Sequence, residues 1–165
     1  MGTVVIILFI SFWLGIFLTI VFSITASQKK KAKLIKLHLK EEKLCHYKVQ
    51  FLQVKTSKYT AIGGVWIKVD FYFNENLILI APDSDSFFSG MNNFNLPVII
   101  TNNHELYHNK TFSSKIKKAT EINYPWTKTM KIKYREIGMF DNKYDIQIRF
   151  NQKADMEKFR LINKV

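Results

Sequence analysis

The sequence contains little cysteine, proline or glycine. Its single cysteine, Cys45, has no second thiol to pair with, which excludes a small secreted domain held together by internal disulfides. Three prolines and six glycines among 165 residues exclude collagen-like and low-complexity chains. A compact domain usually contains about 100–200 residues. The chain is therefore expected to form one modest domain.

Acidic residues are also scarce, with 13 Asp and Glu against 25 Lys and Arg and a formal net charge of +12. Residues 1–28 carry no charged side chain of either sign. The run from Val4 to Phe22 is apolar except at Ser11, Gly15 and Thr19. About 20 apolar residues cross the roughly 30 Å hydrocarbon core of a bilayer as one helix. The sequence therefore predicts a transmembrane anchor with its flank over residues 1–27.

A cleavable signal peptide is the alternative interpretation of this segment. Signal peptides have a basic start, an apolar core of about 7–15 residues and a small-x-small cleavage site. Only Thr25-Ala26-Ser27 resembles such a site, while the apolar run is longer and no basic residue precedes it. These features favour an anchor that is not removed.

Lysine is abundant directly after the apolar run and absent before it. Residues 28–46 form a basic juxtamembrane connector that contains seven lysines: Lys29, Lys30, Lys31, Lys33, Lys36, Lys40 and Lys43. Positive charge near a membrane segment favours the cytoplasmic side. The sequence therefore predicts a single-pass protein of the cell membrane, with its N-terminus outside and its C-terminal domain in the cytoplasm.

The connector also contains the candidate binding residues of this sequence. A lysine close to an anionic leaflet contributes about 1 kcal/mol of attraction. We therefore expect contact with lipid headgroups from four residues: Lys29, Lys30, Lys31 and Lys33. The alternative is that these lysines act only as a stop-transfer signal. His38 and His46 are expected to be ordinary solvated residues rather than metal ligands.

From Tyr47 onward apolar and polar residues alternate, which is typical of half-buried strands. Alternation is clearest over residues 65–73, and an Asn-rich turn at 74–76 joins this strand to an apolar strand at 77–81, which predicts a hairpin. Strands at 129–137 and 144–150 predict a second hairpin. Weaker patterns predict strands at 48–55, 96–101 and 115–124, and a long polar loop at 83–95.

The chain ends in a short amphipathic segment that predicts a helix over residues 151–164. Asn151 is the expected N-cap, and early acids with late bases suit the helix dipole. Met156, Phe159 and Ile162 share one face of this helix.

Two stretches, Gly64–Val69 running into Asn76–Ile80 and the later Ala154–Phe159, carry a resemblance to a known family. Together with seven candidate strands and a final helix, they make residues 47–165 similar to a bacterial pleckstrin-homology-like (PH/GRAM-like) domain. The resemblance implies a mainly β, α+β fold in which a bent seven-stranded barrel is plugged by the C-terminal helix. It also implies a non-enzymatic module, without a cofactor, that binds lipids or proteins.

Members of this family that recognise phosphoinositides carry a lysine followed later by two basic residues separated by one. Lys58 and Lys68 fill the first two positions here, but Asp70 stands where the last base belongs. This departure argues against specific phosphoinositide recognition.

The segment His104-Glu105-Leu106-Tyr107-His108 satisfies the H-E-x-x-H pattern of zinc hydrolases. On a helix the two histidines would hold zinc while the glutamate acts as general base. However, the motif follows an extended run, and no third ligand is placed on a partner helix. We therefore expect no metal site here, and a membrane-tethered zinc hydrolase remains the enzymatic alternative.

The remaining patterns are weaker. Cys45 lacks the orienting groups of a catalytic nucleophile, and the basic strand from Trp126 to Arg135 resembles any strand with one wet face more than a nucleic-acid surface. The sequence therefore predicts a non-catalytic binding module that contacts a protein partner or an anionic lipid surface, with no nucleic acid. A structural subunit of a larger membrane assembly is the remaining alternative.

Overall fold

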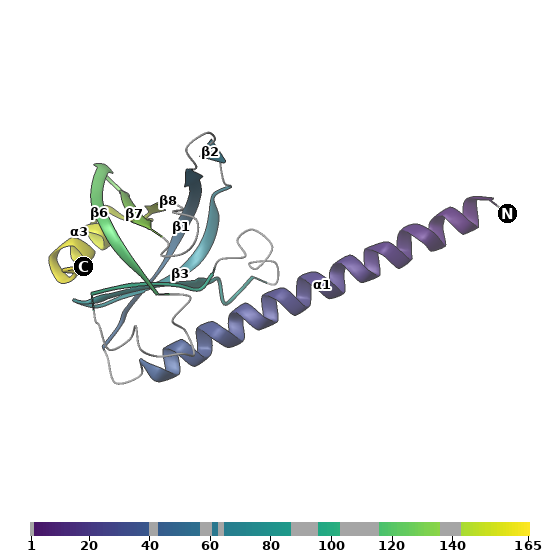
Figure 1. The fold of residues 1–165 in the computed structure, drawn as a ribbon, viewed down its shortest axis with the longest axis horizontal. Helices are drawn as coiled ribbons and strands as arrows, with labels where there is room; N and C mark the ends of the chain where they lie inside the picture. The colour runs from purple at the N-terminus through teal and green to yellow at the C-terminus, as the bar shows by residue number, and fades with distance from the viewer. Residues whose placement is uncertain are drawn as a thin grey trace.

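The computed structural model describes residues 2–39, 43–56, 61–62, 65–86, 96–102, 116–135 and 143–165. In this part of the chain a long helix is followed by a sheet closed into a ring and by a short helix (Figure 1). This is the α+β class that the sequence predicts. The elements are α1 (Gly2–His38), β1 (Cys45–Thr56), β2 (Ala61–Ile62), β3 (Ile67–Phe73), β4 (Leu77–Pro82), β5 (Val98–Thr101), β6 (Ile116–Trp126), β7 (Thr129–Arg135), β8 (Lys143–Arg149) and α3 (Lys153–Ile162).

Helix α1 contains 37 residues and is about 55 Å long at 1.5 Å per residue. No proline or glycine lies between Ile16 and His38 to interrupt it. The predicted anchor and the start of the predicted connector therefore belong to one unbroken helix. Its N-terminal half projects away from the strands, and its C-terminal half lies along the sheet (Figure 1). Within the described residues it is the one helix long and apolar enough to cross a membrane.

Strand β1 closes the ring because its two halves pair with different strands. Residues 45–51 pair with β3 and residues 50–56 pair with β8, both antiparallel. The sheet order is β2-β1-β3-β4-β5-β6-β7-β8, and the two-residue β2 pairs only with the end of β1. Seven strands thus form the ring, and β2 lies beside it.

The two predicted hairpin pairings are confirmed. Phe73 of β3 lies opposite Ile78 of β4, and Thr129 of β7 lies opposite Arg149 of β8. The β5–β6 pair is parallel, so the sheet is mixed. Strand β2 is not predicted by the sequence, because a two-residue ladder has too few residues to show alternation.

The inside of the ring is filled by apolar side chains from every long strand and from α3. The ring centroid of Phe159 on α3 lies 5.0 Å from that of Phe73 and 5.5 Å from that of Phe71. Met156 is buried beside Phe159, and Ile162 packs against the same cluster. The predicted apolar face of the last helix is therefore correct.

The predicted N-cap of this helix is wrong. Gln152 is the N-cap residue, with extended backbone and no capping side-chain hydrogen bond. The Asn151 amide instead donates a hydrogen bond to the carbonyl oxygen of Lys48 on β1, at 3.0 Å. Asn151 therefore attaches the start of the helix segment to the ring.

A second apolar cluster lies outside the ring, where α1 covers β3, β4 and β5. Ala32, Ile35 and Leu39, spaced three and four residues apart, form one helical stripe. They pack in a cluster with sheet residues that include Tyr72, Leu79 and Ile99. All six residues of β4 are buried, because core fills one face and α1 covers the other.

Candidate binding groove between the helix and the sheet

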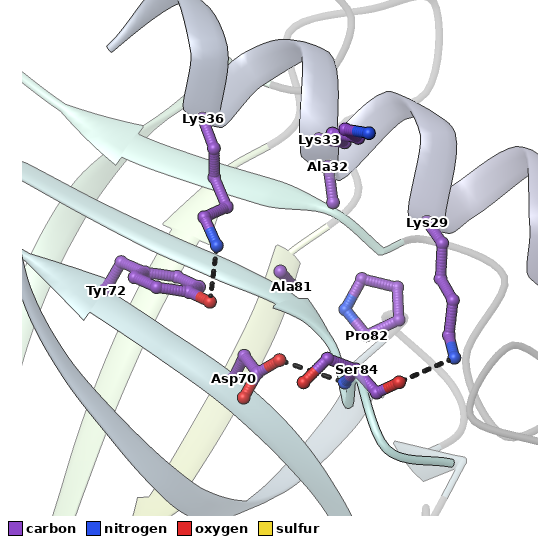
Figure 2. Close-up of a pocket in the computed structure, with 9 residues that line it drawn as sticks. All are labelled: Lys29, Ala32, Lys33, Lys36, Asp70, Tyr72, Ala81, Pro82 and Ser84. Carbon is purple, nitrogen blue, oxygen red and sulfur yellow. Dashed lines mark hydrogen bonds between the residues drawn. The ribbon is translucent and has the colours of Figure 1, made fainter. Parts of the chain in front are cut away.

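A groove of about 200 Å³ lies between α1 and the β3–β4 hairpin (Figure 2). Ala32 of α1 and Ala81 of β4 face each other across it with small side chains, and Pro82 and Ser84 continue its wall. Short side chains at these positions leave space between a helix and a sheet that otherwise pack closely. We call this feature the helix–sheet groove.

Three lysines of α1 line the helix–sheet groove, at spacings of four and three residues that place them on one side of the helix. The Lys29 ammonium donates a hydrogen bond to the backbone oxygen of Ser84 at 2.9 Å. Lys36 donates to the Tyr72 hydroxyl at 2.8 Å, and its nitrogen lies 4.3 Å from the centre of the Tyr72 ring. Lys33 also lines the groove between them.

The four predicted lipid-contact lysines are therefore not equivalent. Lys29 and Lys33 line the helix–sheet groove, whereas Lys30 and Lys31 are absent from its lining. Lys30 and Lys31 are exposed, because a period of 3.6 residues turns them away from the stripe that packs on the sheet. Lys36 also lines the groove, although in the sequence it is only one more charge of the connector.

Asp70 lies at the base of the groove and is 2% exposed. Its carboxylate accepts a hydrogen bond from the Ser84 backbone N–H at 2.9 Å. The other oxygen lies 3.0 Å from Nε2 of His46, whose ring stacks on Tyr72 at 4.4 Å between centroids. The His46 side chain is 43% exposed, as the sequence predicts for a solvated residue, but it also contacts Asp70 and Tyr72. The lining holds three ammonium groups and one carboxylate, a net charge of +2.

A lysine of β1 fixes the turn that follows β4. The Lys48 ammonium donates to Asp83 at 2.9 Å and also to Asp85. The hydrogen bond to Asp85, followed by that to Asp83, raises the pKa of Lys48 above its ordinary value. The same contact lowers the pKa of Asp85. This network holds the turn that carries Ser84 beside the groove.

Several sequence-predicted site residues lie elsewhere. The segment 104–108 and Lys58 lie outside the described residues. Lys68 is exposed on β3, on the same face as Asp70 and Tyr72 but beyond the groove lining. Cys45 is partly buried and packs against the inner core.

The basic strand β7 carries its lysines in ion pairs with neighbouring strands. Lys131 lies 2.9 Å from Asp145 of β8, and Lys133 lies 2.5 Å from Glu121 of β6. The hydrogen bond between Lys133 and Glu121 lowers the pKa of Glu121 and raises the pKa of Lys133. These cations serve cross-strand contacts of the sheet.

No family model matches the sequence, and neither the curated proteins nor the solved structures contain a significant match to it.

Proposed function

We propose that this protein is a single-pass membrane protein whose β domain is a non-catalytic binding module at the cytoplasmic surface of the cell membrane, where it contacts anionic lipid. The unbroken helix α1, which joins the apolar run to the lysine-lined groove, is the observation that carries this proposal. The positive-inside asymmetry of the lysines supports the orientation, with the N-terminus outside.

The length of α1 between its apolar run and its lysines supports lipid contact. Lys29 follows Phe22 by seven residues, which corresponds to about 10 Å along a helix. The headgroup layer of each leaflet is about 5–8 Å thick, and lysine side chains extend toward it while their stems stay on apolar surface. The first ammonium groups therefore lie within reach of lipid phosphates.

Packing of α1 on the sheet supports a fixed position of the domain. Ile35 and Leu39 are buried against the ring, and Val21 and Thr25 are buried further along the helix. The helix runs from the apolar segment into this packed segment without a break, so no flexible linker joins the two. The domain is thus held at the surface instead of moving on a flexible linker.

We also propose that the β domain is PH-like. A ring of seven strands with a C-terminal helix packed against its inner core agrees with the element order of that family. The lysine-lined groove outside the ring agrees with a module that binds rather than catalyses.

Lipid selectivity of the full chain tests this function. The protein is reconstituted in phosphatidylcholine vesicles that contain a trace of spin-labelled phosphatidylglycerol or spin-labelled phosphatidylcholine, and the motionally restricted fraction of each lipid is measured. We expect the anionic lipid to be enriched beside the protein by several-fold, because each lysine near the surface contributes about 1 kcal/mol at most. Salt should reduce the enrichment.

A matched pair of variants localises the effect. Replacing Lys29, Lys30, Lys31 and Lys33 with glutamine should abolish most of the enrichment. The control replaces four exposed lysines near the other end of the chain: Lys128, Lys153, Lys158 and Lys164. It removes the same charge and should retain the enrichment. Equal restriction of both lipids by the unmodified protein contradicts lipid contact.

A further inference from the structure

We propose that the helix–sheet groove is a binding site for a phosphate group, carried either by a lipid headgroup or by a soluble phosphate compound. The lipid source rests on the proposed function, whereas binding of a soluble phosphate does not. The site is formed by one face of α1, by the strands β3 and β4, and by the turn that follows β4.

The charge of the groove favours an anion. Its lining carries a net charge of +2, and a phosphate monoester carries about −1.5 to −2 at neutral pH. A cation would meet three ammonium groups and a single carboxylate, so repulsion exceeds attraction. Lysine binds phosphate as a point charge, without the planar geometry that arginine requires.

The carboxylate of Asp70 repels an anion, but the three lysines of the lining outweigh its single negative charge. One oxygen accepts the Ser84 N–H and the other contacts His46. A buried carboxylate that keeps these partners helps to fix the groove wall. It also holds His46 against the Tyr72 ring, which orients the Tyr72 hydroxyl toward Lys36.

Lys33 and Lys36 supply the donors that remain. Within the described part of the chain, neither ammonium group has a carboxylate at ion-pair distance. An ammonium group has three N–H donors, and the Tyr72 hydroxyl accepts only one from Lys36. The Tyr72 hydroxyl retains its own proton as a further donor. In Figure 2 the Lys36 ammonium group reaches down to the Tyr72 hydroxyl, whereas the Lys33 ammonium group lies close to α1 at the edge of the groove.

The volume is adequate for a phosphate group. The groove measures about 200 Å³, and a water molecule occupies about 30 Å³ in the liquid, so roughly seven waters fill it. A phosphate group with five heavy atoms can replace several of these waters. Its remaining ester oxygen would point through the open side of the groove toward a lipid backbone or solvent.

Amine footprinting of the full chain in phosphatidylcholine nanodiscs tests the site. Labelling rates of individual lysines are measured by mass spectrometry with inorganic phosphate or with chloride at equal ionic strength. We expect Lys33 and Lys36 to be labelled about threefold more slowly when phosphate fills two thirds of the sites, by mass action. Lys30 and Lys31, next to the groove but outside its lining, should be unchanged.

Two further nanodisc compositions identify the source of the phosphate. Phosphatidic acid presents a phosphate monoester, and phosphatidylglycerol presents a diester, at matched surface charge. Protection of Lys33 and Lys36 by phosphatidic acid without added phosphate indicates a lipid source. Protection only by added inorganic phosphate indicates a soluble source. Either result supports the groove.

Two outcomes overturn the proposal. If no composition protects Lys33 and Lys36, the groove does not bind phosphate. If Lys30, Lys31, Lys33 and Lys36 are protected equally, the effect is general attraction to an anionic surface, and the proposed function survives without the groove. If lipid selectivity is absent but inorganic phosphate still protects Lys33 and Lys36, the proposed function is rejected and the phosphate site is retained.

Variants separate the site from its surroundings. Lys36→Gln should remove the phosphate protection of Lys33, whereas Lys30→Gln should retain it. Tyr72→Phe keeps the ring that stacks on His46 but removes the hydroxyl, so it should weaken protection several-fold with an unchanged unfolding midpoint. Full protection in both Lys36→Gln and Tyr72→Phe contradicts the assignment.

Discussion

Asp70 connects three parts of the molecule through one buried carboxylate. It lies on β3, accepts the backbone N–H of Ser84 after β4, and contacts His46 on β1. A buried charge is retained only where hydrogen bonds compensate the loss of water. In the sequence, this aspartate appears as an ordinary polar residue of an alternating strand. Its burial follows from α1, which covers that face.

We expect Asp70→Ala to destabilise the full chain by about 1.5–3 kcal/mol, because hydrogen bonds to a buried charged group are lost. The free energy of unfolding of detergent-solubilised protein measures the change. Asp85→Ala is the control, since the Asp85 side chain is 76% exposed and an exposed ion pair contributes little to stability. Equal losses in the two variants would contradict this account.

The Lys48–Asp85 contact predicts a dependence of stability on pH. The pKa of Asp85 is lowered in the folded protein, so its contribution is present above the unfolded value of about 3.9 and is lost as pH falls through the folded pKa. The pKa of Lys48 is raised, so its contribution is present below about 10.4 and is lost as pH rises through the folded pKa.

We therefore expect the unfolding midpoints of the unmodified protein and Asp85→Asn to differ at pH 7 and to converge below about pH 4. Thermal unfolding across pH 2–7 measures this convergence. The difference should be small, because both side chains are solvent-accessible. A difference that stays constant down to pH 2 would show that the ion pair is not its cause.

At the scale of elements, the ring strands were largely predictable and the position of α1 was not. Alternation marks a strand with one wet face, and most ring strands show it. Strand β4 has an unbroken apolar run, Leu77–Ala81, which in retrospect indicates burial on both faces. The sequence pattern alone does not show that α1 covers the outer face of β4. The helix stripe is also difficult to recognise, because Lys33 and Lys36 lie between its apolar members.

Only some of the residues that line the groove were predictable from the sequence, because the position of α1 on the sheet was not. Lysines after an apolar run indicate the membrane boundary, and Lys29 and Lys33 were candidates on that ground. Lys36 and Tyr72 are 36 residues apart, and only the docking of α1 on β3 brings them together. Such contacts depend on tertiary packing and leave no local pattern in a single sequence.

Docking of α1 on the sheet can be tested with two substitutions on the same helix. Ile35 is 2% exposed and Leu37 is 64% exposed. Ile35→Ala should cost about 2–5 kcal/mol in free energy of unfolding, because it leaves a cavity between helix and sheet. Leu37→Ala should stay within about 0.5 kcal/mol. Denaturant unfolding of the full chain provides both values, and equal effects would show that α1 is not packed as described.

At the scale of the whole molecule, the two apolar clusters have different structural roles. The inner core and α3 stabilise the ring, while the outer cluster fixes the ring to α1. If α1 spans the membrane as proposed, its continuity connects the membrane segment directly to the groove. A change in the tilt of α1 in the bilayer would therefore also reorient the groove relative to the lipid surface.

Site-specific thiol labelling of intact cells tests the central claim most directly. In a Cys45→Ala background, Thr3→Cys places a thiol before the apolar run, and Lys153→Cys places one on exposed α3. A membrane-impermeant maleimide should label Thr3→Cys in intact cells and Lys153→Cys only after permeabilisation. Labelling of Lys153→Cys from outside intact cells would place the β domain on the opposite side of the membrane and contradict the account.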